Sequence, residues 1–163
     1  MADQLDKFQL SIDSVEKWLK KIQAKFDRIG RKNGDSGGAI EATIEIRGVG
    51  YSALIVPLST GVTMLFDTGV IVEGDQIQLG ASLTVLVNDR IPFGNFEISN
   101  GRLVFKVSTF FEPNEGAPHS ALSRCLSSAF VQINNYTPGI KKVFAGEIDA
   151  ANVVAYAEGS MAV

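Results

Sequence analysis

Two alternating runs joined by an Asn-Gly pair constrain this chain more than any other feature of its sequence. The pair stands at positions 100–101, between NFEIS and RLVFKV, and Asn-Gly is a preferred type I′ turn of a two-residue β-hairpin. With that turn, Phe96 faces Phe105 and Ile98 faces Leu103, so four apolar side chains share one face. A slip by one residue would mix apolar and polar side chains on each face. The sequence therefore predicts an antiparallel hairpin in this register.

The opposite face of this hairpin mixes polar side chains with Val104 and, further along, Phe110. An antiparallel sheet that is covered by helices on one face leaves its other face free, and clustered apolar residues on a free face mark binding surfaces. We therefore predict that Val104 and Phe110 contribute to a protein-binding patch or contact a second subunit. The sequence leaves open the alternative that the N-terminal helix covers these two side chains.

Residues 12–30 have the spacing of an amphipathic helix. Asp13 and Glu16 have the separation of a capping box, and the face opposite the apolar one is basic. The sequence predicts an N-terminal helix over residues 12–30, preceded by a flexible segment, residues 1–11. A basic helix can lie on an anionic membrane, but only if it is undocked, and we expect a solvated face instead. The apolar positions are Val15, Trp18, Leu19, Ile22, Phe26 and Ile29.

After this helix the chain changes to a flexible linker and then to strands. Residues 31–40 are rich in Gly and short polar side chains, which predicts a linker. The period then becomes two, and alternating runs at 43–47, 51–56 and 62–66 predict an antiparallel meander. Whether residues 70–72 extend the meander is left open.

The remaining segments favour helices. Residues 76–90 combine strand propensity in LTVLVN with helical spacing of leucine and valine, and we interpret them as a short helix that ends before Ile91-Pro92. A second strong helix is predicted from Ala117-Pro118 to Tyr136, interrupted by Thr137-Pro138-Gly139. Residues 140–144 and 148–156 predict a final, broken helix rich in Ala.

Together these elements predict an α+β fold, an antiparallel sheet of about five strands with an N-terminal helix, a short middle helix and C-terminal helices packed on it. A chain of 163 residues fits a single domain, which would bury roughly 70% of its unfolded surface. We assign residues 1–163 to one domain. Its α+β core spans residues 41–145, and an Ala-rich helix and tail span residues 146–163.

Composition narrows the class of protein. The net charge of −3 argues against nucleic-acid binding, since such domains are usually strongly basic on one face. The lone Cys125 cannot form an internal disulfide, so nothing requires an oxidising compartment. The first residues lack the apolar core of a secretory signal, and no apolar run is long enough for a spanning helix. We expect a cytoplasmic protein that does not act at a membrane.

Residues with reactive side chains do not form a known motif. His119 is the only histidine, and Cys125 lies six positions away on the apolar face of the predicted helix, which favours a core cysteine over a nucleophile. We therefore predict a protein with no catalytic residue, no cofactor and no metal site. The alternative is a small-molecule-binding or catalytic domain whose polar pocket would gather Asp67, Asp89, Arg90 and His119.

The string NDRIPFGNFEISNGRLVFKV at residues 88–107 resembles the central segment of YbjN-type domains, the bacterial sensory-transduction-regulator group. In that group a helix end that contains asparagine is followed by a Pro-[FY]-G-x-[FY] break and a hairpin. The resemblance implies a fold similar to that of type III secretion chaperones, and it covers residues 12–145 in element order. It implies no enzyme activity and no catalytic residue. It implies a non-enzymatic protein-binding domain, chaperone-like or regulatory, that forms a homodimer.

Overall fold

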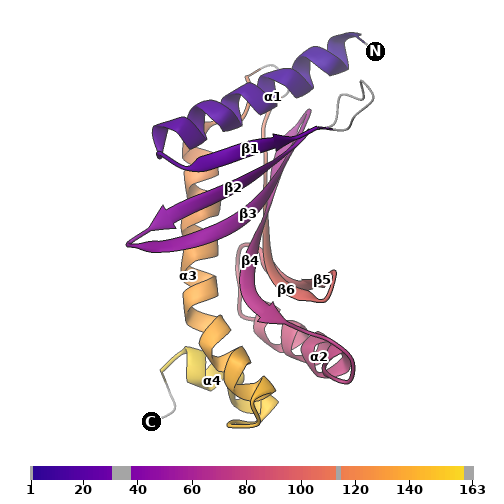
Figure 1. Ribbon diagram of the computed structural model, residues 1–163, viewed down its shortest axis with the longest axis vertical. Coiled ribbons are helices and arrows are strands. Elements are labelled where there is room, and N and C mark those ends of the chain that lie inside the picture. Colours follow the sequence, from indigo (N-terminus) through magenta and orange to yellow (C-terminus); the bar gives the residue numbers. More distant parts are fainter. Residues whose placement is uncertain (1, 31–37, 113–114, 160–163) are drawn as a thin grey trace. The chain divides into compact units, whose positions relative to one another are not determined.

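The computed structural model describes residues 2–30, 38–112 and 115–159, and for residues 2–5 the backbone alone (Figure 1). The described residues form an α+β fold, so the predicted fold class is confirmed. Its sheet has six strands in the order β1-β2-β3-β4-β6-β5. The elements are α1 (Ala2–Lys21), β1 (Lys25–Ile29), β2 (Ala39–Ile46), β3 (Val49–Leu58), β4 (Gly61–Ile71), α2 (Gln76–Asn88), β5 (Asn95–Ser99), β6 (Arg102–Phe110), α3 (His119–Phe144), the 3₁₀ turn η1 (Ala150–Asn152) and α4 (Val153–Ala157).

Residue contacts divide the chain into two compact units. The first unit comprises Met1–Phe66 and Val107–Leu126, and the second comprises Asp67–Lys106 and Ser127–Val163. Strands β4 and β6 and helix α3 each contribute residues to both. The single domain expected from chain length stays a prediction.

In the first unit, α1 covers one face of the sheet and contacts β1 and β3. Half of the apolar stripe that the sequence predicts is buried under α1, since Val15, Trp18 and Leu19 are each at most 1% exposed. Its last three positions lie beyond α1, where Ile22 and Phe26 are half-buried and Ile29 is exposed. The indole Nε1 of Trp18 donates a hydrogen bond of 3.0 Å to Ser123 Oγ at the start of α3. This bond satisfies the single polar group of the largest side chain in that core.

The predicted helix over residues 12–30 is wrong at both ends. Helix α1 already begins at Ala2, so residues 2–11 are helical and not flexible, and Ser11 is buried. Beyond Lys21 the chain turns back at Gln23, whose φ is 58°, and residues 25–29 form strand β1 in register with β2. The ladder with β2 satisfies the backbone of this segment, which a periodic pattern of side chains alone does not predict.

The expected capping box is not a helix start either. Asp13 and Glu16 lie within α1, where both pair with Arg28 of β1. Arg28 Nε donates a hydrogen bond to Glu16 Oε1. This bond and the attraction of the nearby positive charge lower the pKa of Glu16. Part of the basic character of the segment is therefore balanced internally. Residues 31–37 of the expected linker lie outside the described residues, and Ala39 and Ile40 already belong to β2.

In the second unit, the hairpin of β5 and β6 has the predicted register, with Phe96 opposite Phe105 and Ile98 opposite Leu103. The two phenylalanine rings meet edge to face, their centroids 5.0 Å apart, a favourable geometry for aromatic pairs. Gly94 precedes β5 with φ of 91°, and a Cβ atom there would lie 2.5 Å from Phe105 Cζ. Only glycine fits this position, which explains the Pro-Phe-Gly break.

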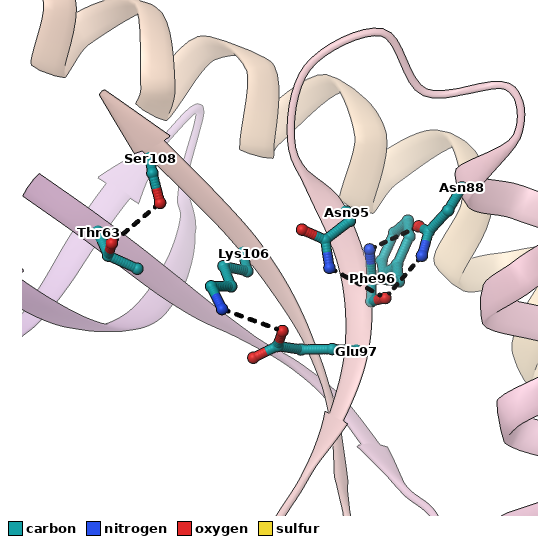
Figure 2. A network of polar contacts seen from close by, with 7 residues as sticks. All are labelled: Thr63, Asn88, Asn95, Phe96, Glu97, Lys106 and Ser108. Carbon is teal, nitrogen blue, oxygen red and sulfur yellow. Dashed lines mark hydrogen bonds and ion pairs between the residues drawn. The ribbon is translucent and has the colours of Figure 1, made fainter. Parts of the chain in front are cut away.

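Helix α2 confirms the predicted middle helix, and its last residue anchors the hairpin. Asn88 donates from Nδ2 to the carbonyl oxygen of Phe96 (2.9 Å) and accepts from its backbone nitrogen at Oδ1 (2.7 Å). Figure 2 shows this two-bond clasp beside the longer contact from Asn95. Since β5 is an edge strand, the clasp satisfies backbone groups that no further strand pairs. The segment from residue 88 to 96 therefore has a structural role, which is to hold β5 against the end of α2.

The predicted interruption at residues 137–139 is wrong, because α3 continues to Phe144 with Pro138 inside it. Packing offsets the cost of the proline. Ile140 and Val143, one turn further on, are buried. At Gly139 a Cβ atom would lie 2.9 Å from Tyr156 Cδ1, so the absence of a side chain lets α3 approach the C-terminal segment closely. Of the predicted final, broken helix, residues 140–144 belong to α3, and residues 148–156 correspond to η1 and α4.

Candidate functional site: an open sheet face

One face of the sheet in the first unit has no covering helix among the residues of that unit that the structure describes. Residues directly opposite in a ladder share a face, so the pairs Ile29 with Ala39, Leu54 with Leu65 and Leu58 with Gly61 identify it. Thr63 and Ser108 hydrogen-bond at 2.9 Å on the same face (Figure 2). We call this surface the open face. Its large apolar side chains are Ile29, Leu54, Val56, Leu58, Leu65 and Phe110.

Four of these side chains are well exposed: Ile29 by 42%, Leu54 by 37%, Leu58 by 42% and Phe110 by 77%. The ring of Phe110 lies against Gly61, where a Cβ atom would be 3.1 Å from Phe110 Cδ1. A contiguous exposed apolar surface of this kind is typical of an interaction site.

A groove of about 400 Å³ lies at one end of the open face. Its walls are the ends of β1 and β3 and the start of β2, with Phe8 of α1 beside them. Most of the side chains that line it are apolar, so it can accept one or two bulky apolar groups. The lining residues are Phe8, Ile29, Gly30, Gly38, Ala39, Val56, Pro57 and Leu58.

A smaller, polar hollow of about 260 Å³ lies further along the same strands. Asp27 of β1 stands directly opposite Glu41 of β2 there, and both are exposed. Lys25 also lines the hollow, together with Thr43 and Ser52. Asp27 of the hollow and Ile29 of the groove are two residues apart on β1 and lie on the same face, so the polar hollow and the apolar groove adjoin.

The second unit exposes an apolar stripe on α2. Between Gln76 and Asn88 the helix has no charged residue, and its exposed side includes Ile77 (52% exposed), Val85 (71%) and Leu86 (41%). The C-terminal end of α2 also borders a hollow of about 610 Å³, with Ala151 and Val154 on the other side. The exposed side also carries the polar residues Gln78 and Ser82, and this uncharged stripe is a second candidate contact surface.

The two site residues predicted from sequence differ in exposure. Phe110 belongs to the first unit and is the most exposed large apolar side chain among the described residues. Val104 belongs to the second unit and is 9% exposed. A role of either residue in protein binding stays a prediction. Sequence reasoning missed Leu54 and Leu58, although YSALIVPL, apolar at nearly every position, was a signal that both faces of β3 are apolar.

The polar groups of the alternative pocket have local partners of their own. Asp67 pairs with Arg102 at 2.7 Å, and Asp89 lies 4.0 Å from its neighbour Arg90. His119 is the first residue of α3. Cys125 is fully buried, and burial raises its pKa to about 11, so the thiol stays protonated at neutral pH. Within the part of the chain that the structure describes, no three His, Cys, Asp or Glu side chains are grouped to hold a metal ion.

Comparison with solved structures places the fold. The crystal structure of YbjN from E. coli, described as a candidate transcription regulator, matches over 75% of this chain and 84% of its own, with a TM-score of 0.51 and 12% sequence identity. This chain has a YbjN-like fold. The resemblance seen in the sequence is thereby confirmed at the level of the fold. No family model and no curated protein matches the sequence. No helix among the described residues is long and apolar enough to cross a membrane.

Proposed function

We propose that this protein is a non-enzymatic protein-binding domain, chaperone-like or regulatory, that binds a partner segment on the open face of its first unit. The observation that carries the proposal is the exposed apolar surface from Ile29 to Phe110, which no helix among the described residues of the first unit covers. The YbjN-like fold supports it, because the E. coli protein of that fold is described as a candidate regulator. We expect the protein to act in the cytoplasm.

The test compares partner capture by the wild-type protein with capture by variants of the open face. Leu54→Glu and Phe110→Glu each place a carboxylate on that face without altering a buried residue. Val131→Glu is the matched control, because Val131 is a similarly exposed apolar residue (46%) on α3, in the second unit. Captured proteins from native lysate are quantified by mass spectrometry.

We expect specific partners to be lost with both open-face variants and retained with Val131→Glu. Equal capture by all proteins would contradict the proposal. Far-ultraviolet circular dichroism of each variant establishes that it is folded.

The protein is also proposed to be a homodimer that forms through the stripe on α2. The stripe is uncharged, whereas Glu73 and Asp75 precede the helix, and the neighbours Asp89 and Arg90 follow it. If α2 of one copy packs antiparallel to α2 of the other, Arg90 of each copy lies beside the acidic start of the other helix. Because Asp89 offsets the charge of Arg90, the association rests on the self-complementary uncharged stripe.

Light scattering tests this proposal directly. A homodimer has about twice the chain mass of 17.5 kDa. Val85→Glu should give a monomer, since it brings two carboxylates together near the symmetry axis, and Val131→Glu should leave the dimer intact. A monomeric wild-type protein would show that the stripe serves another purpose.

A further inference from the structure

We propose that the open face selects an amphipathic helix of a partner protein that carries a lysine or arginine one turn from its bulky apolar residues. The inference rests on the protein-binding function proposed above and specifies the chemistry of the segment that is bound. Its basis is the adjacency of the apolar groove and the polar hollow.

The carboxylates of Asp27 and Glu41 determine the charge of the partner. They stand directly opposite each other in the antiparallel ladder, where two like charges are destabilising. Among the residues that the structure describes, neither makes an ion pair. Lys25 in the same hollow supplies one positive charge against these two negative charges, so the hollow has one uncompensated negative charge. A cation from a partner would balance it.

The separation of the two sites determines the spacing in the partner. Asp27 is two residues from Ile29, and Glu41 is two residues from Ala39, on the same face. Two residues of a strand span roughly 7 Å. Positions i and i+4 of a helix are about 6 Å apart along its axis. An apolar side chain in the groove and a cation at the carboxylates therefore fit one turn of helix.

The backbone argues for a helix instead of an extended segment. The inner strand β2 is paired on both sides, with β1 and β3, so the face above it offers no free backbone group. An extended segment lying on that face would leave its own N–H and C=O groups without partners, whereas a helix satisfies them internally. A helix on the open face also adds a third layer, so that both faces of the sheet in the first unit are covered by helices.

Fluorescence anisotropy with synthetic peptides tests the proposal. The probes are three fluorescein-labelled helical peptides of about 15 residues, with leucines on one face and lysine, glutamine or glutamate at position i+4 from the central leucine. The protein variants are Asp27→Asn with Glu41→Gln, and Glu45→Gln as the matched control. Glu45 lies on the same strand and face as Glu41 but outside the hollow.

We expect the wild-type protein to bind the lysine peptide about fivefold to tenfold more tightly than the glutamate peptide, since two exposed ion pairs are exchanged for two repulsions. The preference should weaken as salt is added. In the double variant, where Lys25 is the only charged residue left in the lining of the hollow, the preference should be lost or reversed, and in Glu45→Gln it should persist. The fluorescence of Trp18, the only tryptophan, verifies that each variant keeps its core.

The outcomes separate this inference from the function on which it rests. Equal binding of all three peptides, or loss of partner capture without binding of any peptide, would overturn the basic-helix proposal and leave protein binding through the open face intact. Capture that is insensitive to the open face would overturn both. Binding to vesicles of phosphatidylcholine and phosphatidylserine in place of the lysine peptide would identify the occupant as a membrane and also overturn the proposal.

Discussion

Replacing Asn88 by alanine removes the clasp between α2 and the edge strand β5. Two hydrogen bonds are lost, at 2.7 and 2.9 Å to the backbone nitrogen and oxygen of Phe96. A net contribution of about 1 kcal/mol for each bond gives a destabilisation of about 2 kcal/mol. The site is only partly buried, so water can replace part of this energy, whereas the full cost of a buried unpaired group would raise it to roughly 3 kcal/mol.

Urea denaturation followed by circular dichroism measures this loss as a lower midpoint with an unchanged slope. Asn95→Ala is the matched control, since Asn95 reaches the same carbonyl oxygen over 3.4 Å, a long and weak hydrogen bond. Asn88→Asp keeps the acceptor but turns a carboxylate oxygen toward the carbonyl of Phe96, and should be at least as destabilising as the alanine variant. If Asn88→Ala were no less stable than Asn95→Ala, the clasp would not hold the hairpin.

Three further predictions concern single positions. Gly94→Ala should cost roughly 2–5 kcal/mol, because positive φ and steric overlap add, whereas Gly48→Ala, with φ of 79° and nothing within 4 Å, should cost only about 1 kcal/mol; equal midpoints in urea would contradict the overlap. Ser123→Ala leaves the indole N–H of Trp18 unpaired and should cost about 1–3 kcal/mol, with a shifted tryptophan emission; unchanged emission and stability would show that the bond contributes nothing. The stability supplied by the neutral Cys125 thiol is fully present below pH 9.0 and lost as the pH rises toward about 11, because only the unfolded thiol ionises in that window. Urea titrations over that pH range should therefore show a smaller loss of stability in Cys125→Ala than in the wild-type protein.

The hairpin could be predicted in full because all of its determinants are local. The Asn-Gly turn and the alternation of Phe96, Ile98, Leu103 and Phe105 specify turn and register together. The apolar stripe of α1 was found for the same reason. These features need no knowledge of the rest of the chain.

Strand β1 and the continuous α3 could not be predicted because long-range contacts decide them. Phe26 and Ile29 continue the helical spacing of α1, and only pairing with β2 makes them a strand. Thr137-Pro138-Gly139 is a strong local break signal, but buried Ile140 and Val143 hold the helix together beyond it. In both places tertiary packing overrides local propensity.

A free sheet face with Phe110 on it was predicted, but Leu54 and Leu58 of the open face were missed, for a different reason. Helix α1 is amphipathic and buries its apolar face within the first unit. Strand β3 and helix α2 are not amphipathic: β3 exposes Leu54 and Leu58, and α2 exposes Val85, although each element also buries apolar residues. A core needs only one apolar face from each covering element, so a second apolar face has no function inside the monomer. Loss of amphipathicity in an element at the surface is thus a more specific indication of a contact site than one exposed side chain such as Phe110. The same rule identifies both the open face and the stripe on α2.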